Sequence, residues 1–117
     1  MSDLDRFYLS VGTTSEEVVG RLGGNESMVR RFLKRFSEDR SFEELSIALN
    51  ANDVDSSFRF AHTLKGVAAN LGIETLFKEA SAVTELLRAK KLEEAKIAFP
   101  SLEKEYRRVC SLLEDLG

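Results

Sequence analysis

The chain has very few of the residues that mark secreted, membrane-spanning or redox proteins. Its 117 residues include one cysteine, one proline, one histidine and no tryptophan. The single cysteine, Cys110, cannot form an intramolecular disulfide, which fits a reducing compartment, and we interpret it as a small, part-buried residue. No apolar run approaches the roughly 20 residues of a membrane span, and the polar, acidic residues 1–5 do not resemble a secretory signal. We therefore expect a cytoplasmic protein with no membrane partner.

A concentrated basic surface is also missing from the sequence. The net charge is −3 and the pI is about 5.3, whereas a nucleic-acid-binding protein needs a stripe of lysine and arginine to contact phosphates. The one basic cluster is followed at once by Glu38 and Asp39, which favours a solvated helix face. Its members are Arg30, Arg31, Lys34 and Arg35. We therefore expect no nucleic-acid partner.

Signals for β-strands are absent, because no segment shows a sustained period of two or an Asn-Gly or Asp-Gly turn. Apolar residues recur instead at helical spacing. A short helix should end at Gly23-Gly24, and a longer one should run over residues 54–72, ending at Gly72. Further helices are predicted from residue 25, from residue 41, over about residues 74–90 and from residue 92. The side chains that can cap the first residues of these helices are Thr13 or Thr14, Asn25, Ser41 and Asp53.

The last predicted helix is interrupted in sequence by the only proline, Pro100. Its apolar stripe keeps the same phase on both sides of the proline, which favours one kinked helix over two separate ones. At the other end of the chain, Leu4, Phe7, Tyr8 and Val11 predict a short helix lying over one end of the fold. We predict an all-α, up-and-down four-helix bundle with additional short N-terminal helices. Residues 1–117 should form a single domain, with residues 1–15 as a peripheral N-terminal segment.

The only histidine, His62, lies in a helix that is apolar on its opposite face. With about 100° between successive residues, Leu64 marks the centre of the apolar stripe and His62 points about 160° away from it. Lys65 flanks the histidine, while Gly66 and Ala69 follow it on the outer face, so nothing larger than a methyl group covers the ring from that side. The spacing predicts an exposed and reactive imidazole.

An exposed neutral imidazole offers a nucleophilic nitrogen that can take a phosphoryl group, and a neighbouring ammonium can balance the added negative charge. The glycine one turn away leaves room for the phosphoryl group and its donor. The sequence has no second histidine, no glycine-rich phosphate loop and no cluster of metal-ligating residues that would complete a self-sufficient catalyst. We therefore expect a partner protein to share the chemistry.

Residues 61–72 have the pattern Ala-His-x-Leu-Lys-Gly-(x)5-Gly, which resembles the signature of the histidine-containing phosphotransfer (HPt) domain. The likeness extends to residues 22–26 and the amphipathic helix after them, to Asn52-Asp53 before the histidine helix, and to residues 92–95 at the start of the last helix. It covers about residues 16–116 in all. HPt domains carry phosphoryl groups in multistep two-component relays.

The resemblance implies that His62 accepts the phosphoryl group, that Lys65 balances its charge and that Gly66 gives it access. Some members of the family place a carboxylate or carboxamide on the next helix, where it hydrogen-bonds the free ring nitrogen. The equivalent position here is Thr84, with Glu85 adjacent, so these two residues are the candidates for that orienting role.

Three further residues of the histidine helix, Phe58, Arg59 and Ala69, are candidates for docking a partner. Phe58 either tucks against a neighbouring helix or lies exposed on the docking surface. Arg59 is either a solvated side chain or a contact to phosphate. The sequence leaves both pairs of alternatives open.

The resemblance implies a phosphoryl carrier and not an enzyme. It would accept the group on His62 from one receiver-domain aspartate and pass it to another. The expected partners are response-regulator receiver domains and a hybrid sensor histidine kinase. Mg²⁺ is expected on the receiver, with no metal or cofactor on this chain. We expect the chain to be a monomer. The alternative is a helical interaction module that docks a receiver or another signalling protein without phosphoryl turnover.

Overall fold

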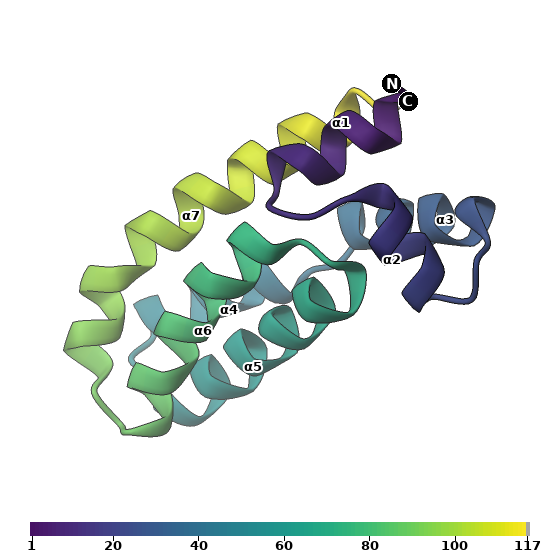
Figure 1. Cartoon of the computed structure of the whole chain (residues 1–117). Helices are drawn as coiled ribbons and strands as arrows, with labels where there is room; N and C mark the ends of the chain where they lie inside the picture. Colours follow the sequence, from purple (N-terminus) through teal and green to yellow (C-terminus); the bar gives the residue numbers. More distant parts are fainter. Residues whose placement is uncertain (117) are drawn as a thin grey trace.

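The computed structural model describes residues 1–116 and contains, within them, helices and no strand (Figure 1). The all-α fold predicted from the sequence is confirmed. Its helices are α1 (Asp3–Ser10), α2 (Ser15–Arg21), α3 (Glu26–Ser37), α4 (Ser41–Asn50), α5 (Val54–Leu71), α6 (Glu74–Arg88) and α7 (Leu92–Glu114). No helix in this part of the chain combines the length and the apolarity that crossing a membrane requires.

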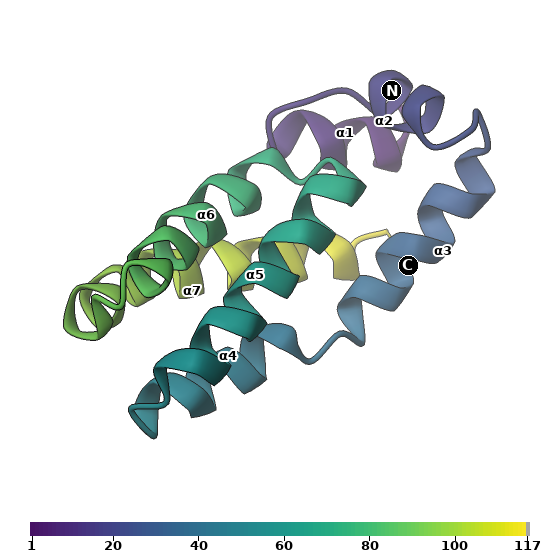
Figure 2. The ribbon, with the colours of Figure 1, turned by 90° about the horizontal axis from the view of Figure 1, so that it is seen from below.

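Helices α4 to α7 form the bundle. Short connections join each helix to the next, so that α5 packs between α4 and α6, and α6 packs against α7. Seen from below, α3 continues the edge begun by α4 and lies beside the other end of α5 (Figure 2). The molecule is elongated, with extents of 43 × 23 × 21 Å. This arrangement leaves one long face of α5 without a covering helix.

Side-chain caps fix where most of these helices begin. Thr14, Asn25 and Asp53 each accept a hydrogen bond from the backbone N–H three residues further on, as predicted. The predicted cap at Ser41 is wrong, because Ser41 is already the first residue of α4. Its backbone N–H donates to the carboxylate of Asp39 at 2.7 Å, so the aspartate two residues earlier serves the role that we assigned to the serine.

Helix α7 is continuous through Pro100, which confirms the prediction of a single helix in place of two separate ones. The proline lies exposed, while Ala95, Leu102 and Val109 on the opposite side are buried. The uninterrupted apolar stripe therefore outweighs the loss of one backbone hydrogen bond.

The N-terminal helices pack against the end of α5, where the chain turns into α6 (Figure 1). Tyr8 of α1 is completely buried, and its hydroxyl donates to the carbonyl of Leu71 at 2.8 Å. The turn is made by Gly72, which has a φ of +72°. A Cβ atom there would lie 2.5 Å from Cγ2 of Val18 in α2. The helix predicted within residues 1–12 thus exists, and it fixes the C-terminal end of the histidine helix.

Candidate functional site

Helix α5 presents the histidine. The helix is held at its start by the Asp53 cap and at its end by Gly72 in the left-handed conformation. Ala61 and Leu64 are completely buried against the bundle, whereas His62 is exposed. This is the orientation that the helical spacing predicts.

The ring of His62 stacks on an aromatic neighbour from the preceding turn of α5. The Phe58 and His62 rings lie 5.7 Å apart between centroids, with planes inclined by 19°. Phe58 is half-buried, and the guanidinium of Arg88 on α6 lies 5.0 Å from its centroid. Phe58 thus packs against a neighbouring helix and also forms one wall of the histidine site, so the two alternatives open in the sequence are not exclusive. The stack restricts the positions that the imidazole can adopt.

Lys65 lies beside the histidine and leans towards α6. Its Nζ is 3.8 Å from Oε2 of Glu85 and 5.9 Å from the ring centroid of Phe77. The lysine side chain is 26% exposed, against 56% for the glutamate. Glu85 also pairs with Arg88, at 3.3 Å. The ammonium therefore stands on the α6 side of α5, one helical turn from His62, and is engaged by a carboxylate.

The outer face of α5 next to the histidine is open. A Cβ atom at Gly66 would meet nothing from residues 1–116 within 4 Å, so packing there does not require a glycine at this helical position. Ala69, the next small residue on this face, is half-buried. A glycine inside a helix lowers stability by about 1 kcal/mol relative to alanine. At Gly66 no packing contact within the described residues offsets that cost, so the fold does not explain this glycine.

The structure does not bring Thr84 to the imidazole. Thr84 is completely buried on the inner face of α6, and its hydroxyl donates to the carbonyl of Ala80 at 2.7 Å. Glu85 does face the site, but its carboxylate contacts Lys65 and Arg88. In residues 1–116 neither of the two candidates hydrogen-bonds His62, so we correct the orienting role assigned to them from the sequence.

The exposed face of α5 also carries Arg59, which donates to the hydroxyl of Ser56 at 3.1 Å and lines a hollow with Phe58 and with Arg88 of α6. Another side of α5 contacts α3. A groove of about 380 Å³ follows between the two helices, beginning five residues after His62. Sequence reasoning missed this groove because it depends on how α3 packs. It is lined by Leu22, Phe32, Arg35, Phe36, Asp39, Val67, Asn70 and Leu71.

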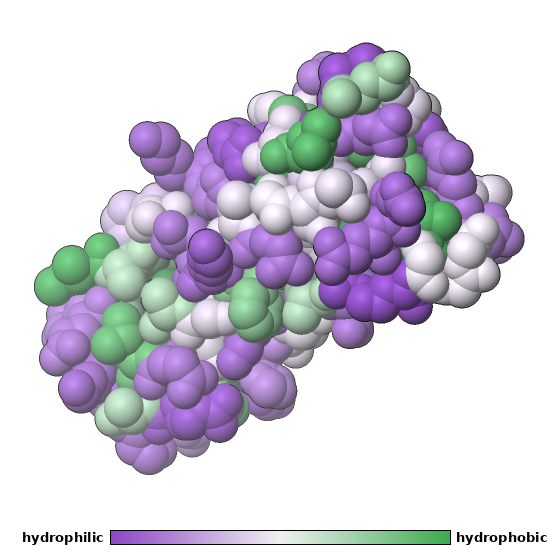
Figure 3. All heavy atoms as spheres, in the orientation of Figure 1, coloured by the Kyte–Doolittle hydropathy of each residue, from purple (hydrophilic) through white to green (hydrophobic). Residues whose placement is uncertain are grey.

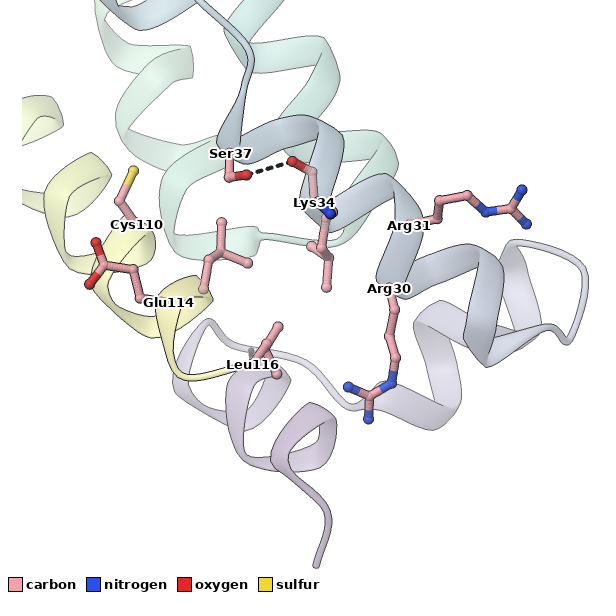
Figure 4. Close-up of a pocket in the computed structure, with 9 residues that line it drawn as sticks. Arg30, Arg31, Lys34, Ser37, Cys110, Glu114 and Leu116 are labelled. Atoms are coloured by element: carbon pink, nitrogen blue, oxygen red, sulfur yellow. Dashed lines mark hydrogen bonds between the residues drawn. The ribbon is translucent and has the colours of Figure 1, made fainter.

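A second hollow, of about 630 Å³, lies between α3 and α7 and includes no residue of α5 (Figure 4). Arg30 at its edge pairs with Asp3 at 2.7 Å and with Glu26 at 3.0 Å, so it is not the simple solvated side chain that we predicted. Burial raises the pKa of the Cys110 thiol in its wall. A raised pKa lowers the thiolate fraction and hence the reactivity of this cysteine.

Elsewhere the surface is mostly polar. The face seen in Figure 3 carries apolar groups as small separate areas among charged ones. The large apolar side chains that are most exposed between residues 2 and 116 are Leu9, Ile47 and Ile97. Over the same part of the chain, no three His, Cys, Asp or Glu side chains gather in a way that could hold a metal ion.

The comparisons with known proteins gave one finding. A family model described as Hpt domain matches residues 27–116, which span most of α3 and all of α4 to α7. No curated protein and no solved structure matched the chain. The matched range contains His62, Lys65, Gly66 and the α6 residues that face them.

Proposed function

Because the chain belongs to the Hpt domain family, whose members act in histidine phosphotransfer, we propose that it is a phosphorelay carrier that uses His62. It accepts a phosphoryl group from an aspartyl phosphate of one receiver domain and passes it to an aspartate of another. The observation that carries this proposal is the constellation on the open face of α5. An exposed imidazole is followed, one helical turn on, by a lysine and by an unobstructed glycine.

The transfer is a nucleophilic displacement at phosphorus. The lone pair of the unprotonated ring nitrogen of His62 forms an N–P bond, while the P–O bond to the receiver's aspartate breaks and the carboxylate leaves with the electron pair. The other ring nitrogen keeps its proton. Passing the group on is the same step in reverse with a different receiver, so the histidine is restored in each cycle.

The two proteins contribute different parts of the chemistry. The receiver supplies Mg²⁺ and most of the charge stabilisation in the transition state, and this chain positions the nucleophile. The ammonium of Lys65 balances part of the phosphoryl charge once the group is on His62. Gly66 leaves space for the phosphoryl group and for the receiver's own loops.

Receiver docking would use the open face of α5 together with the groove between α3 and α5. Arg59 lies three residues before His62 and Ala69 seven residues after it, and the groove begins about 7.5 Å beyond the histidine along the helix axis at 1.5 Å per residue. Apolar walls with one arginine and one aspartate suit a small, transient interface. A carrier must release one receiver before it meets the next, whether the first belongs to a hybrid sensor histidine kinase or to a separate protein.

The proposal is tested by incubating the protein with receivers whose aspartate carries a ³²P-labelled phosphoryl group. We expect acid-labile, alkali-stable label on the wild type and none on a His62→Gln variant with an unchanged melting temperature. Label that persisted in the variant would contradict the proposal. Receiver binding without any phosphohistidine would favour the alternative function, a docking module without turnover.

A further inference from the structure

His62 and four other side chains form a continuous series of contacts between α5 and α6. The series runs from the ring of His62 to Phe58, from Phe58 to the guanidinium of Arg88, from Arg88 to Glu85, and from Glu85 to Lys65. Lys65 is three residues after His62, so the last member of the series lies one helical turn from the reactive group. One member, Glu85, carries a negative charge close to the site where, on the proposed function, a negatively charged phosphoryl group would be attached.

The carboxylate of Glu85 and a phosphoryl group on His62 would compete for the same ammonium. Nζ of Lys65 lies 3.8 Å from Oε2 of Glu85 in the unphosphorylated protein. It also lies near the face of Phe77, which helps to keep the lysine side chain on the α6 side. Lys65 can stabilise a phosphoryl group on His62 only if its ammonium moves away from Glu85, or if it donates hydrogen bonds to both groups at once.

Arg88 makes such an exchange possible without leaving the glutamate unpaired. Its Nε lies 3.3 Å from both carboxylate oxygens of Glu85. When Lys65 turns towards the phosphoryl group, the carboxylate retains this second cation. The exchange therefore breaks one partly exposed ion pair and leaves no charge without a partner, so its free-energy cost is small and it is readily reversed.

We propose that Glu85 is a positioning residue that sets how readily His62 gives up its phosphoryl group, by competing for Lys65. This inference rests on the proposed carrier function. With Glu85 in place, the phosphohistidine receives only part of the stabilisation that Lys65 can give. The phosphoryl group is then less stable on His62 and is passed more completely to a receiver. Thr84, buried and bonded within its own helix, takes no part in this adjustment.

The test is the equilibrium distribution of label between His62 and a receiver. A Glu85→Gln variant keeps the size of the side chain but loses its charge, and we expect the ratio of phospho-His62 to phospho-receiver to rise about two- to fivefold, as suits an exposed ion pair. Glu103→Gln on α7 is the matched control, because it also removes one carboxylate from an ion pair, here with Arg107. We expect it to leave the ratio unchanged.

A double-mutant cycle identifies Lys65 as the group through which Glu85 acts. In a Lys65→Ala background, Glu85→Gln should leave the ratio unchanged. Raising the salt concentration should reduce the effect of Glu85→Gln in the wild-type background, whereas an effect on packing would persist. An unchanged or lower ratio in Glu85→Gln, or the same rise without Lys65, would overturn this inference. If no variant and no wild-type protein carried label on His62, the proposed function itself would fail.

Discussion

Two glycines, one within α5 and one that ends it six residues later, differ sharply in their surroundings. Gly66 has open space around it, and a Cβ atom there would touch nothing within 4 Å in the described part of the chain. Gly72 has a positive φ, and a Cβ atom there would lie 2.5 Å from Val18. One position is free of any packing requirement, and the other is fixed by the fold.

The difference separates the functional part of α5 from its structural part. Around Gly72 the contacts are buried and distant in sequence, as in the hydrogen bond from Tyr8 to Leu71. Gly66, in contrast, lies on the exposed face of α5, one helical turn after His62. A substitution near Gly72 should therefore reduce stability, whereas one near Gly66 should reduce transfer.

The largest effect on transfer short of removing the histidine should come from Gly66→Leu. The branched side chain would occupy the space over the imidazole that the phosphoryl group needs, and displacing reacting groups by about 1 Å already costs about a hundredfold in rate. We expect transfer from a labelled receiver to slow by at least about that factor, with the urea midpoint equal to or above that of the wild type because the helix gains propensity. Transfer at the wild-type rate would show that the receiver approaches from another side.

Replacing Lys65 should have the next largest effect. Lys65→Ala should lower the extent of phosphorylation by about ten- to a hundredfold, because the phosphoryl charge loses a cation that stands one helical turn from His62. Lys65→Arg should retain part of the activity, since the charge survives although its geometry changes. A time course with both variants and one receiver measures this. Equal rates for the wild type and both variants would mean that the receiver alone balances the charge.

The smallest effect on transfer, and the largest on stability, should come from Gly72→Ala. A positive φ and a methyl group pressed against Val18 should lower the free energy of unfolding by about 2–4 kcal/mol. Transfer per folded molecule should stay close to that of the wild type. Gly66→Ala is the matched control, and in urea denaturation it should be stabilising by up to about 1 kcal/mol. Equal midpoints for the two variants would remove the distinction between the two glycines.

The local features of α5 could be predicted from the sequence because they depend on nearby residues. Asp53 and Gly72 are signals within the helix's own ends, and both appear at the predicted positions. The spacing of Ala61, Leu64 and Ala68 determines which face is buried, and it therefore placed His62 on the opposite, exposed face.

The parts that could not be predicted depend on how helices rotate against each other. Thr84 and Glu85 were selected by matching their sequence positions to those of the family. Such a match predicts how far along α6 a residue lies, but it does not predict which side of α6 faces the histidine. Thr84 is buried in the core, and Glu85 meets Lys65 where we had expected a contact to the imidazole. The contact between Phe58 and Arg88 is a second case. It joins residues of two helices, 30 positions apart, and nothing in the sequence near either residue predicts it.

One measurement tests the carrier function most directly. Protein labelled on His62 is separated from its donor and mixed with an excess of unphosphorylated receiver and Mg²⁺. The account predicts that acid-labile label leaves His62 and appears on the receiver's aspartate in equal amount, and that the released protein can be labelled again. Label that stays on His62, or that leaves only as inorganic phosphate, would contradict it.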